Sequence, residues 1–154
     1  MLTHMTNEAK LDLIKTDPID QVGQFLKPKG FWYAIGNAWI DWCASEMPDW
    51  IHRYFYVFSI KPGSNMLCID RPQMIHEFSK RYGVNTYYNL REINWIQVNK
   101  DYDGIEFNPY FYDQRFAIDS LWYNAIDVPS GVIFNTDIIQ NLKRYKTNTI
   151  QIIT

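Results

Sequence analysis

Glu106 is the residue that this sequence places most favourably for chemistry. It interrupts an apolar segment over residues 104–108, in which Ile105 and Phe107 flank it directly. Alternation along a strand would point Glu106 to the opposite sheet face from these two neighbours. Its carboxylate then either faces water or lies partly buried in a cleft. In a cleft it would serve as an acid, a base or a stabiliser of positive charge.

A dense group of aromatic residues forms the second candidate site. Residues 29–43 hold Trp32, Trp39 and Trp42, which are three of the six tryptophans in the chain. Large rigid rings at this density suit a cleft that grips a planar ligand, although aromatic residues also dominate ordinary cores. Because neighbours on a strand point to opposite faces, Trp32 and Tyr33 should divide between core and cleft. We assign Tyr33 to the cleft, since its hydroxyl needs a polar partner.

A polar, turn-rich run precedes the last apolar strand and supplies further candidates. Tyr123 begins this part of the chain, and Asp127 and Ser130 belong to an Asp-Val-Pro-Ser-Gly run. Loops before buried strands often carry ligand contacts, while the same run also fits a simple turn. The sequence has no glycine-rich phosphate loop, no nucleophile elbow and no metal-ligand spacing among its three histidines. We therefore expect no metal site.

Composition bounds the class of protein and its partners. The 154 residues fit one domain, 1–154, with a net charge of −2 and no run of Lys or Arg. Nucleic acid is therefore not an expected partner, and a small molecule or a protein is. Neither a signal peptide nor a membrane-length apolar run is apparent, so we expect a cytoplasmic protein without membrane contact. Cys43 and Cys68 are interpreted as buried reduced thiols.

The elements that must position these residues alternate between helix and strand. Apolar spacing predicts helices that Asn37 and Asp70 cap, the second closed by a left-handed Gly83. The expected helices are 8–15, 38–47, 72–82, 91–102 and 136–145, and the expected strands are 31–35, 54–60, 66–69, 104–108, 131–135 and 149–153. A loop is expected over 84–90. This arrangement is α+β, with a curved sheet or two small sheets around a cleft.

Several motifs resemble those of a known family. They are K-P-K-G-F-W from Lys27, I-K-P-G from Ile60, D-Y-D-G-I-E-F from Asp101 and W-Y-x-x-x-D from Trp122. Together they resemble small phage and bacterial proteins that are similar in layout to the ADP-ribosyltransferase fold. The resemblance covers about residues 27–135. It implies a core over 27–154, with two split small sheets and flanking helices around an NAD cleft, and a helical extension over 1–26.

The resemblance also implies roles for individual residues. Gly30, Trp32 and Tyr33 match the first strand, which holds NAD, and Glu106 matches the glutamate beside the nicotinamide ribose. A carboxylate there would stabilise an oxocarbenium-like transition state. The remaining cofactor contacts expected in this cleft are Trp39, Tyr123, Asp127 and Ser130. Gly104 stands where arginine-modifying members carry Glu or Gln, which disfavours modification of arginine.

Two functions follow as expectations. The first is binding of NAD or a related nucleotide in an aromatic cleft, with transfer of ADP-ribose to a macromolecular target. The alternative is a non-enzymatic, phage-encoded inhibitor that binds a host defence protein in the host cytoplasm. Such an inhibitor would use exposed aromatic residues, the residue class that dominates interface hot spots. The residues expected at such a surface are Tyr87, Tyr88, Tyr110, Phe111 and Tyr112, which either project outward or fold back over the core.

Overall fold

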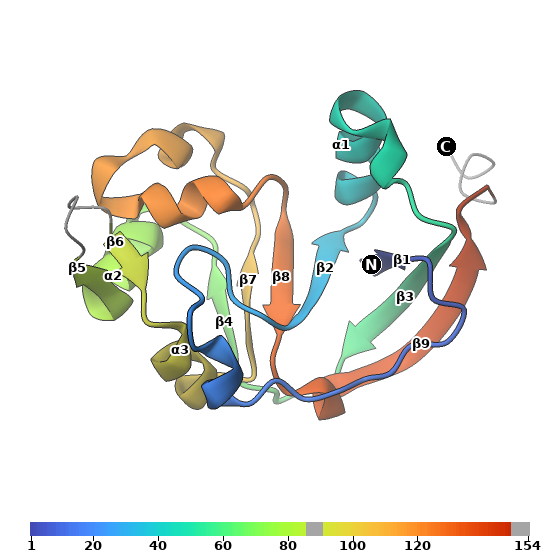
Figure 1. Ribbon diagram of the computed structural model, residues 1–154, viewed down its shortest axis with the longest axis horizontal. Helices are drawn as coiled ribbons and strands as arrows, with labels where there is room; N and C mark the ends of the chain where they lie inside the picture. The colour runs from blue at the N-terminus through green and yellow to red at the C-terminus, as the bar shows by residue number, and fades with distance from the viewer. Residues whose placement is uncertain (86–90, 149–154) are drawn as a thin grey trace.

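The fold is built on one strongly curved sheet. The computed structural model describes residues 1–85 and 91–148. The seven strands of the sheet run in the spatial order β4-β7-β8-β2-β1-β3-β9. Figure 1 shows the sheet turning from the upright β7 and β8 to β3 and β9, which arch along the other side. The strands are β1 (Leu2–Thr6), β2 (Phe31–Ile35), β3 (Tyr54–Ile60), β4 (Met66–Ile69), β7 (Gly104–Phe107), β8 (Ser130–Ile133) and β9 (Ile139–Lys146).

All pairs in this sheet are antiparallel except β4 with β7. Two short strands, β5 (Gly83–Asn85) and β6 (Arg91–Ile93), pair separately with each other. The described strands thus form one continuous sheet and a small ribbon, whereas the family resemblance implied a split pair of small sheets. The broader α+β expectation, in its curved-sheet form, agrees with this architecture.

Most helices cover one face of the sheet. To the left of β4 and β7 in Figure 1 lie α2 (Pro72–Tyr82), α3 (Trp95–Asp101) and the 3-10 helix Ile118–Ala125. The larger core cluster lies between these elements and the sheet, and its biggest fully buried side chains include Trp95, Trp122 and Phe107. A smaller cluster on the other face contains Tyr33 and Phe58. The shorter 3-10 helices are Pro18–Gln21, Pro48–Trp50, Tyr112–Phe116 and Thr136–Ile138.

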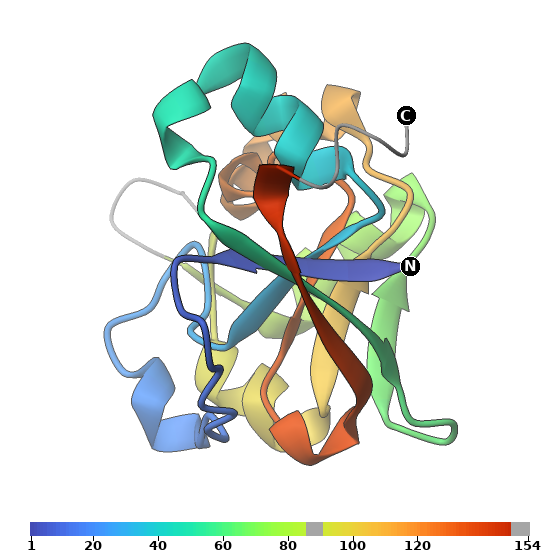
Figure 2. The same cartoon turned by 90° about the vertical axis from the view of Figure 1, so that its right-hand side faces the viewer.

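Helix α1 (Ala38–Glu46) stands apart from this layer. It follows β2 directly and rises above the sheet in both Figure 1 and Figure 2. Its only buried residue is Cys43, which confirms the expectation for this thiol, whereas Cys68 is exposed and contradicts it. Asn37 is the N-cap as predicted, although its side chain makes no capping hydrogen bond.

The N-terminal helical extension expected over 1–26 is wrong. The chain begins with β1, which lies between β2 and β3 and pairs with both. Residues 8–15 form no helix, and this segment runs along the sheet, where Leu13 accepts a bond from Thr136 through its carbonyl oxygen. Pairing with strands more than 25 residues away outweighs the local helical pattern here, because β2 and β3 would otherwise expose unpaired backbone groups.

The helix expected over 136–145 is also wrong. A single 3-10 turn, Thr136–Ile138, leads into β9, which pairs with β3 along most of its length. The register shifts between Val57 and Ser59, and Asn141 has a positive φ of 57°. Asparagine tolerates this conformation better than most residues. Long-range pairing again outweighs a local amphipathic pattern.

The other predicted elements either agree with the structure or differ only at their ends and caps. Strands 31–35, 54–60 and 66–69 and helix 72–82 have the predicted limits. Arg71, not Asp70, is the N-cap of α2, and Gly83 has an extended φ of −67° because it begins β5. The expected helix over 91–102 divides into β6 and α3, and Asn94 caps α3 by accepting a bond from the backbone of Gln97. The strand expected over 149–153 and the residues Tyr87 and Tyr88 lie outside the described residues.

Candidate functional site

A pocket opens where β1 and β2 separate. Their register is limited to Leu2 with Ile35 and Thr3 with Ala34, whereas β1 pairs with β3 over its whole length. Beyond Thr3, the His4 ring supplies the hydrogen-bond donor that a backbone N–H would supply in a regular strand pair. Its Nδ1 donates to the carbonyl oxygen of Trp32 at 2.6 Å, and a carbonyl accepts only, so Nδ1 carries the hydrogen.

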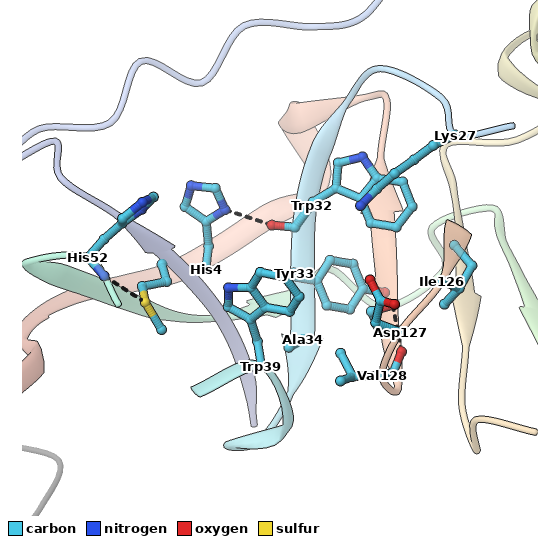
Figure 3. Close-up of a pocket in the computed structure, with 12 residues that line it drawn as sticks. His4, Lys27, Trp32, Tyr33, Ala34, Trp39, His52, Ile126, Asp127 and Val128 are labelled. Atoms are coloured by element: carbon cyan, nitrogen blue, oxygen red, sulfur yellow. Dashed lines mark hydrogen bonds between the residues drawn. The ribbon is translucent and has the colours of Figure 1, made fainter. Parts of the chain in front are cut away.

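This pocket encloses about 230 Å³ beside α1, and Figure 3 shows the residues that line it. Side chains from β1, β2, α1 and the loop before β8 contribute to it, together with His52 from the loop before β3. The apolar lining consists of Met5, Trp32, Tyr33, Ala34, Trp39, Ile126 and Val128. The polar lining consists of His4, Lys27, His52, Asp127 and Ser130. A mostly apolar cavity with a few polar groups is the usual form of a small-molecule site.

Trp32 and Lys27 form one side of the pocket. The Lys27 Nζ lies 4.3 Å from the centre of the Trp32 ring, a cation–π contact. Trp32 is fixed by its Nε1, which donates to the Pro28 carbonyl oxygen at 3.1 Å. Loss of hydration lowers the pKa of Lys27, and the charge of Asp127 partly opposes this shift. A cation and a carboxylate that act on each other therefore line this pocket.

Trp39 lines the pocket from α1. Its ring stacks on that of Trp42 with centres 4.9 Å apart and an interplanar angle of 11°. Trp50 lies against the same pair. This tryptophan group extends from the pocket onto the outer surface, where Trp50 is 47% exposed. The group is therefore both a wall of the pocket and a surface feature.

His4 and His52 occupy the end of the pocket away from Lys27 and Asp127 (Figure 3). Burial lowers the pKa of His4, the bond to Trp32 opposes this shift, and the nearby His52 lowers the pKa further. The backbone N–H of His52 donates to the sulfur of Met5. The Nδ1 atom of His52 is buried and has no hydrogen-bond partner among the described residues.

Glu106 lies outside this pocket. Its carboxylate accepts a 2.6 Å hydrogen bond from the Tyr33 hydroxyl. Tyr33 packs in the smaller core cluster and Trp32 against the larger one, so the two rings lie on opposite faces of β2. Burial and then the charge of Glu106 raise the pKa of Tyr33. The hydroxyl therefore stays protonated and donates to the carboxylate.

Gly131 makes the bond between Tyr33 and Glu106 feasible. In the sheet register Gly131 stands between them, facing Tyr33 on β2 and Glu106 on β7. A Cβ atom at Gly131 would lie 2.4 Å from the Tyr33 ring. The tyrosine therefore reaches across β8 only because this residue has no side chain.

The structure brings together five of the eight predicted site residues. The five that line the pocket are Trp32, Tyr33, Trp39, Asp127 and Ser130. Our choice of Tyr33 for the cleft is only partly right, because Tyr33 is 3% exposed and its hydroxyl faces Glu106. The Ser130 hydroxyl is engaged as well, since it donates to the Val128 carbonyl oxygen at 2.8 Å.

The three others, Gly30, Tyr123 and Glu106, do not line the pocket. Gly30 is required by packing, because a Cβ atom there would lie 2.4 Å from the side chain of Val132. Tyr123 is fully buried, and its hydroxyl accepts a bond from the backbone of Phe111. Both residues thus have structural roles in the described fold.

Sequence reasoning missed Lys27, His4 and His52 as pocket residues. The sequence offers the histidines only as possible metal ligands, and the expected helical extension would place His4 outside the core. No local pattern marks either histidine, because β1 reaches the pocket through pairing with distant strands. Within the described residues, no group of acidic, histidine or cysteine side chains could hold a metal ion.

The aromatic residues expected at a partner surface separate into two groups. Tyr110 and Phe111 pack against the larger core cluster, which places them with the interior. Tyr112 is 60% exposed and lies outward. None of the helices over residues 1–85 and 91–148 is long and apolar enough to cross a lipid bilayer.

Comparison with known proteins found no match to a protein-family model, to a curated protein or to a solved structure.

Proposed function

We propose that the protein binds NAD or a related nucleotide by placing a planar ring in the pocket beside α1. The observation that carries this proposal is the cavity itself, which combines the rings of Trp32 and Trp39 with the charge of Lys27. Indole faces favour stacking of a flat heterocycle. A lysine at the same wall favours the phosphate that such a ring carries in a nucleotide.

The size of the pocket limits what it holds. About 230 Å³ accommodates one ring system and not a whole dinucleotide. The ribose and phosphates would therefore extend past Lys27 to the surface. The pocket lies beside β2, the strand that the resemblance equates with the NAD-holding first strand of the ADP-ribosyltransferase-like proteins.

Binding can be tested by titrating the protein with NAD and following tryptophan fluorescence and heat. We expect Trp32→Ala to weaken binding by about tenfold or more, since loss of base–aromatic stacking costs ~1–3 kcal/mol. Phe116→Ala is a matched control, because Phe116 is a large aromatic residue, 66% exposed and outside the pocket. Unchanged NAD affinity in Trp32→Ala, or no binding by the parent protein, contradicts the proposal.

Transfer of ADP-ribose to a macromolecular target is a further step of this proposal, with Glu106 as its carboxylate. That role requires Glu106 at the nicotinamide ribose, whereas in this structure its carboxylate accepts the Tyr33 hydroxyl. Binding is therefore the stronger part of the proposal. If NAD is cleaved, Glu106→Gln should lower the rate by about 10²–10³, the usual cost of one lost electrostatic contact in a transition state. Release of labelled nicotinamide measures this rate, and unchanged turnover excludes Glu106.

A second candidate function is binding of a protein partner through the aromatic surface of α1. The specific observation is the exposure of Trp50, Met47 and Ile51 beside the stacked tryptophans, since exposed apolar groups mark interaction sites. A phage-encoded inhibitor of a host defence protein would use such a surface. Two results together would favour this function over the first. The parent protein binds no nucleotide but does bind a protein partner, and Trp50→Ser no longer binds that partner.

A further inference from the structure

His52 presents an unusual atom for a folded protein. His52 lines the pocket end, but its Nδ1 atom is enclosed by protein and has no partner among the described residues. Buried polar atoms are almost always paired, because leaving one unpaired costs the full loss of its hydration. A nitrogen that meets a ligand at this end must therefore come from another residue.

His4 beside it offers an atom of defined character. Its Nδ1–H is used by the carbonyl oxygen of Trp32. The neutral ring therefore has a lone pair on Nε2, which accepts a hydrogen bond and does not donate one. No described group bonds to this Nε2. The pocket end thus presents one acceptor of fixed character, His4 Nε2.

We infer that His4 forms the hydrogen-bonding end of the pocket and recognises a ring edge that carries an N–H donor. The ligand N–H donates to His4 Nε2. This inference rests on the proposed function and specifies which part of the nucleotide lies at this end. In NAD two groups carry such a donor, the carboxamide of nicotinamide and the amino group of adenine.

Protonation of His4 would reverse this preference. A protonated His4 donates from both nitrogens and no longer accepts an N–H, so it favours a carboxylate or a carbonyl. The other titratable groups that face the pocket are His52 from the loop before β3, Tyr33 from β2, Lys27 from the loop before β2 and Asp127 from the loop before β8. Tyr56 of β3 pairs with His4 in the sheet register. Lys27 and Asp127 lie at the far end, so His52 is the neighbour that acts on the pKa of His4.

Paired mononucleotides test the inference. Nicotinamide mononucleotide is compared with its nicotinic acid analogue, and AMP is compared with purine riboside 5′-monophosphate, by calorimetry at pH 8 and at a series of lower pH values. In each pair the second compound lacks the N–H donor at the ring edge. We expect about tenfold preference for the first member of one pair at pH 8, the size of one well-formed hydrogen bond. The pair that shows the preference identifies the ring, and the preference should shrink as the pH falls through the pKa of His4, which burial holds below its ordinary value.

Two variants separate recognition from folding. His4→Phe keeps a flat ring but removes Nε2, and we expect it to lose the preference at pH 8. His4→Gln places an amide oxygen near the position of Nε2 and should restore most of it. Equal affinity within both pairs, or full preference in His4→Phe, overturns the inference while leaving nucleotide binding intact. Absence of binding to all four compounds overturns both this inference and the proposed function.

Discussion

At the scale of single residues, Tyr33, Gly131 and Glu106 act as one unit across three strands. The tyrosine ring passes over Gly131 and donates its hydroxyl to the carboxylate at 2.6 Å. We predict that Gly131→Ala lowers the free energy of unfolding by about 1–3 kcal/mol, because the new methyl group overlaps a rigid ring. Urea denaturation of the purified variant measures this change.

A double mutant isolates the cause of that loss. In a Tyr33→Val background the ring is absent, so the added methyl group of Gly131→Ala has space. The cost of the alanine should then fall by about 1 kcal/mol or more relative to its cost in the parent chain, which is the coupling expected for residues in contact. Equal costs in both backgrounds would show that the alanine acts on the backbone of β8 and not on Tyr33.

His4 should make stability depend on pH. Its pKa in the folded protein is held below the ordinary value of 6.5, mainly by burial. The unfolded chain therefore binds more protons than the folded one as the pH falls below about 6.5. The contribution of His4 is complete above that pH and is lost as the pH drops through its folded pKa.

Denaturation midpoints at pH 8, 6.5 and 5.5 measure this loss. The parent protein should weaken steadily over the lower interval, and His4→Asn should show a flatter profile because asparagine does not titrate. The depressed pKa of Asp119 acts in the same direction, but below its ordinary value of 3.8 and thus outside this range. An identical slope in His4→Asn would assign the acid sensitivity to another group.

At the scale of elements, a local sequence pattern predicts the correct secondary structure where the neighbouring segments favour that same structure. Residues 54–60 are apolar on both faces and rich in aromatic residues, and they form β3 with the predicted limits. Residues 136–145 carry an equally clear helical pattern, yet most of them form β9 because β3 offers a partner for their backbone. Pairing between distant segments is not encoded in the spacing of one segment.

The same distinction between local pattern and long-range pairing applies to the candidate site. Trp32 and Trp39 lie 7 positions apart on one strand-to-helix unit, so the sequence alone brought them together as candidates. His4 and His52 reach the same pocket only because β1 inserts between β2 and β3. Glu106 was identified by its type, but its bond to Tyr33 depends on the register of three strands. The residue types at the candidate site could thus be predicted from the sequence, but the residues that they contact in the fold could not.

At the scale of the whole molecule, β1 joins two parts of the sheet. On one side of it lie β2, β8, β7 and β4, and on the other lie β3 and β9. Thr3 strengthens this junction, since its buried hydroxyl donates to the Gly36 carbonyl oxygen at 2.7 Å. Removing β1 would leave facing edges of β2 and β3 with unpaired backbone groups in the interior, each of which costs free energy comparable to a lost hydrogen bond.

We therefore predict that deleting residues 1–7 abolishes cooperative folding, although an N-terminal segment of a chain is often dispensable. The deletion should remove the near-ultraviolet circular dichroism of the buried tryptophans and the sigmoidal urea transition.

The matched control replaces Glu8, Ala9 and Lys10, which are exposed, with Gly and Ser residues. Two neighbouring side chains bond to this segment, from Tyr56 and Arg144, and both use its backbone carbonyl oxygens. The control should therefore unfold like the parent protein, and a deletion variant that keeps a sharp transition would show that the two parts of the sheet hold together without β1.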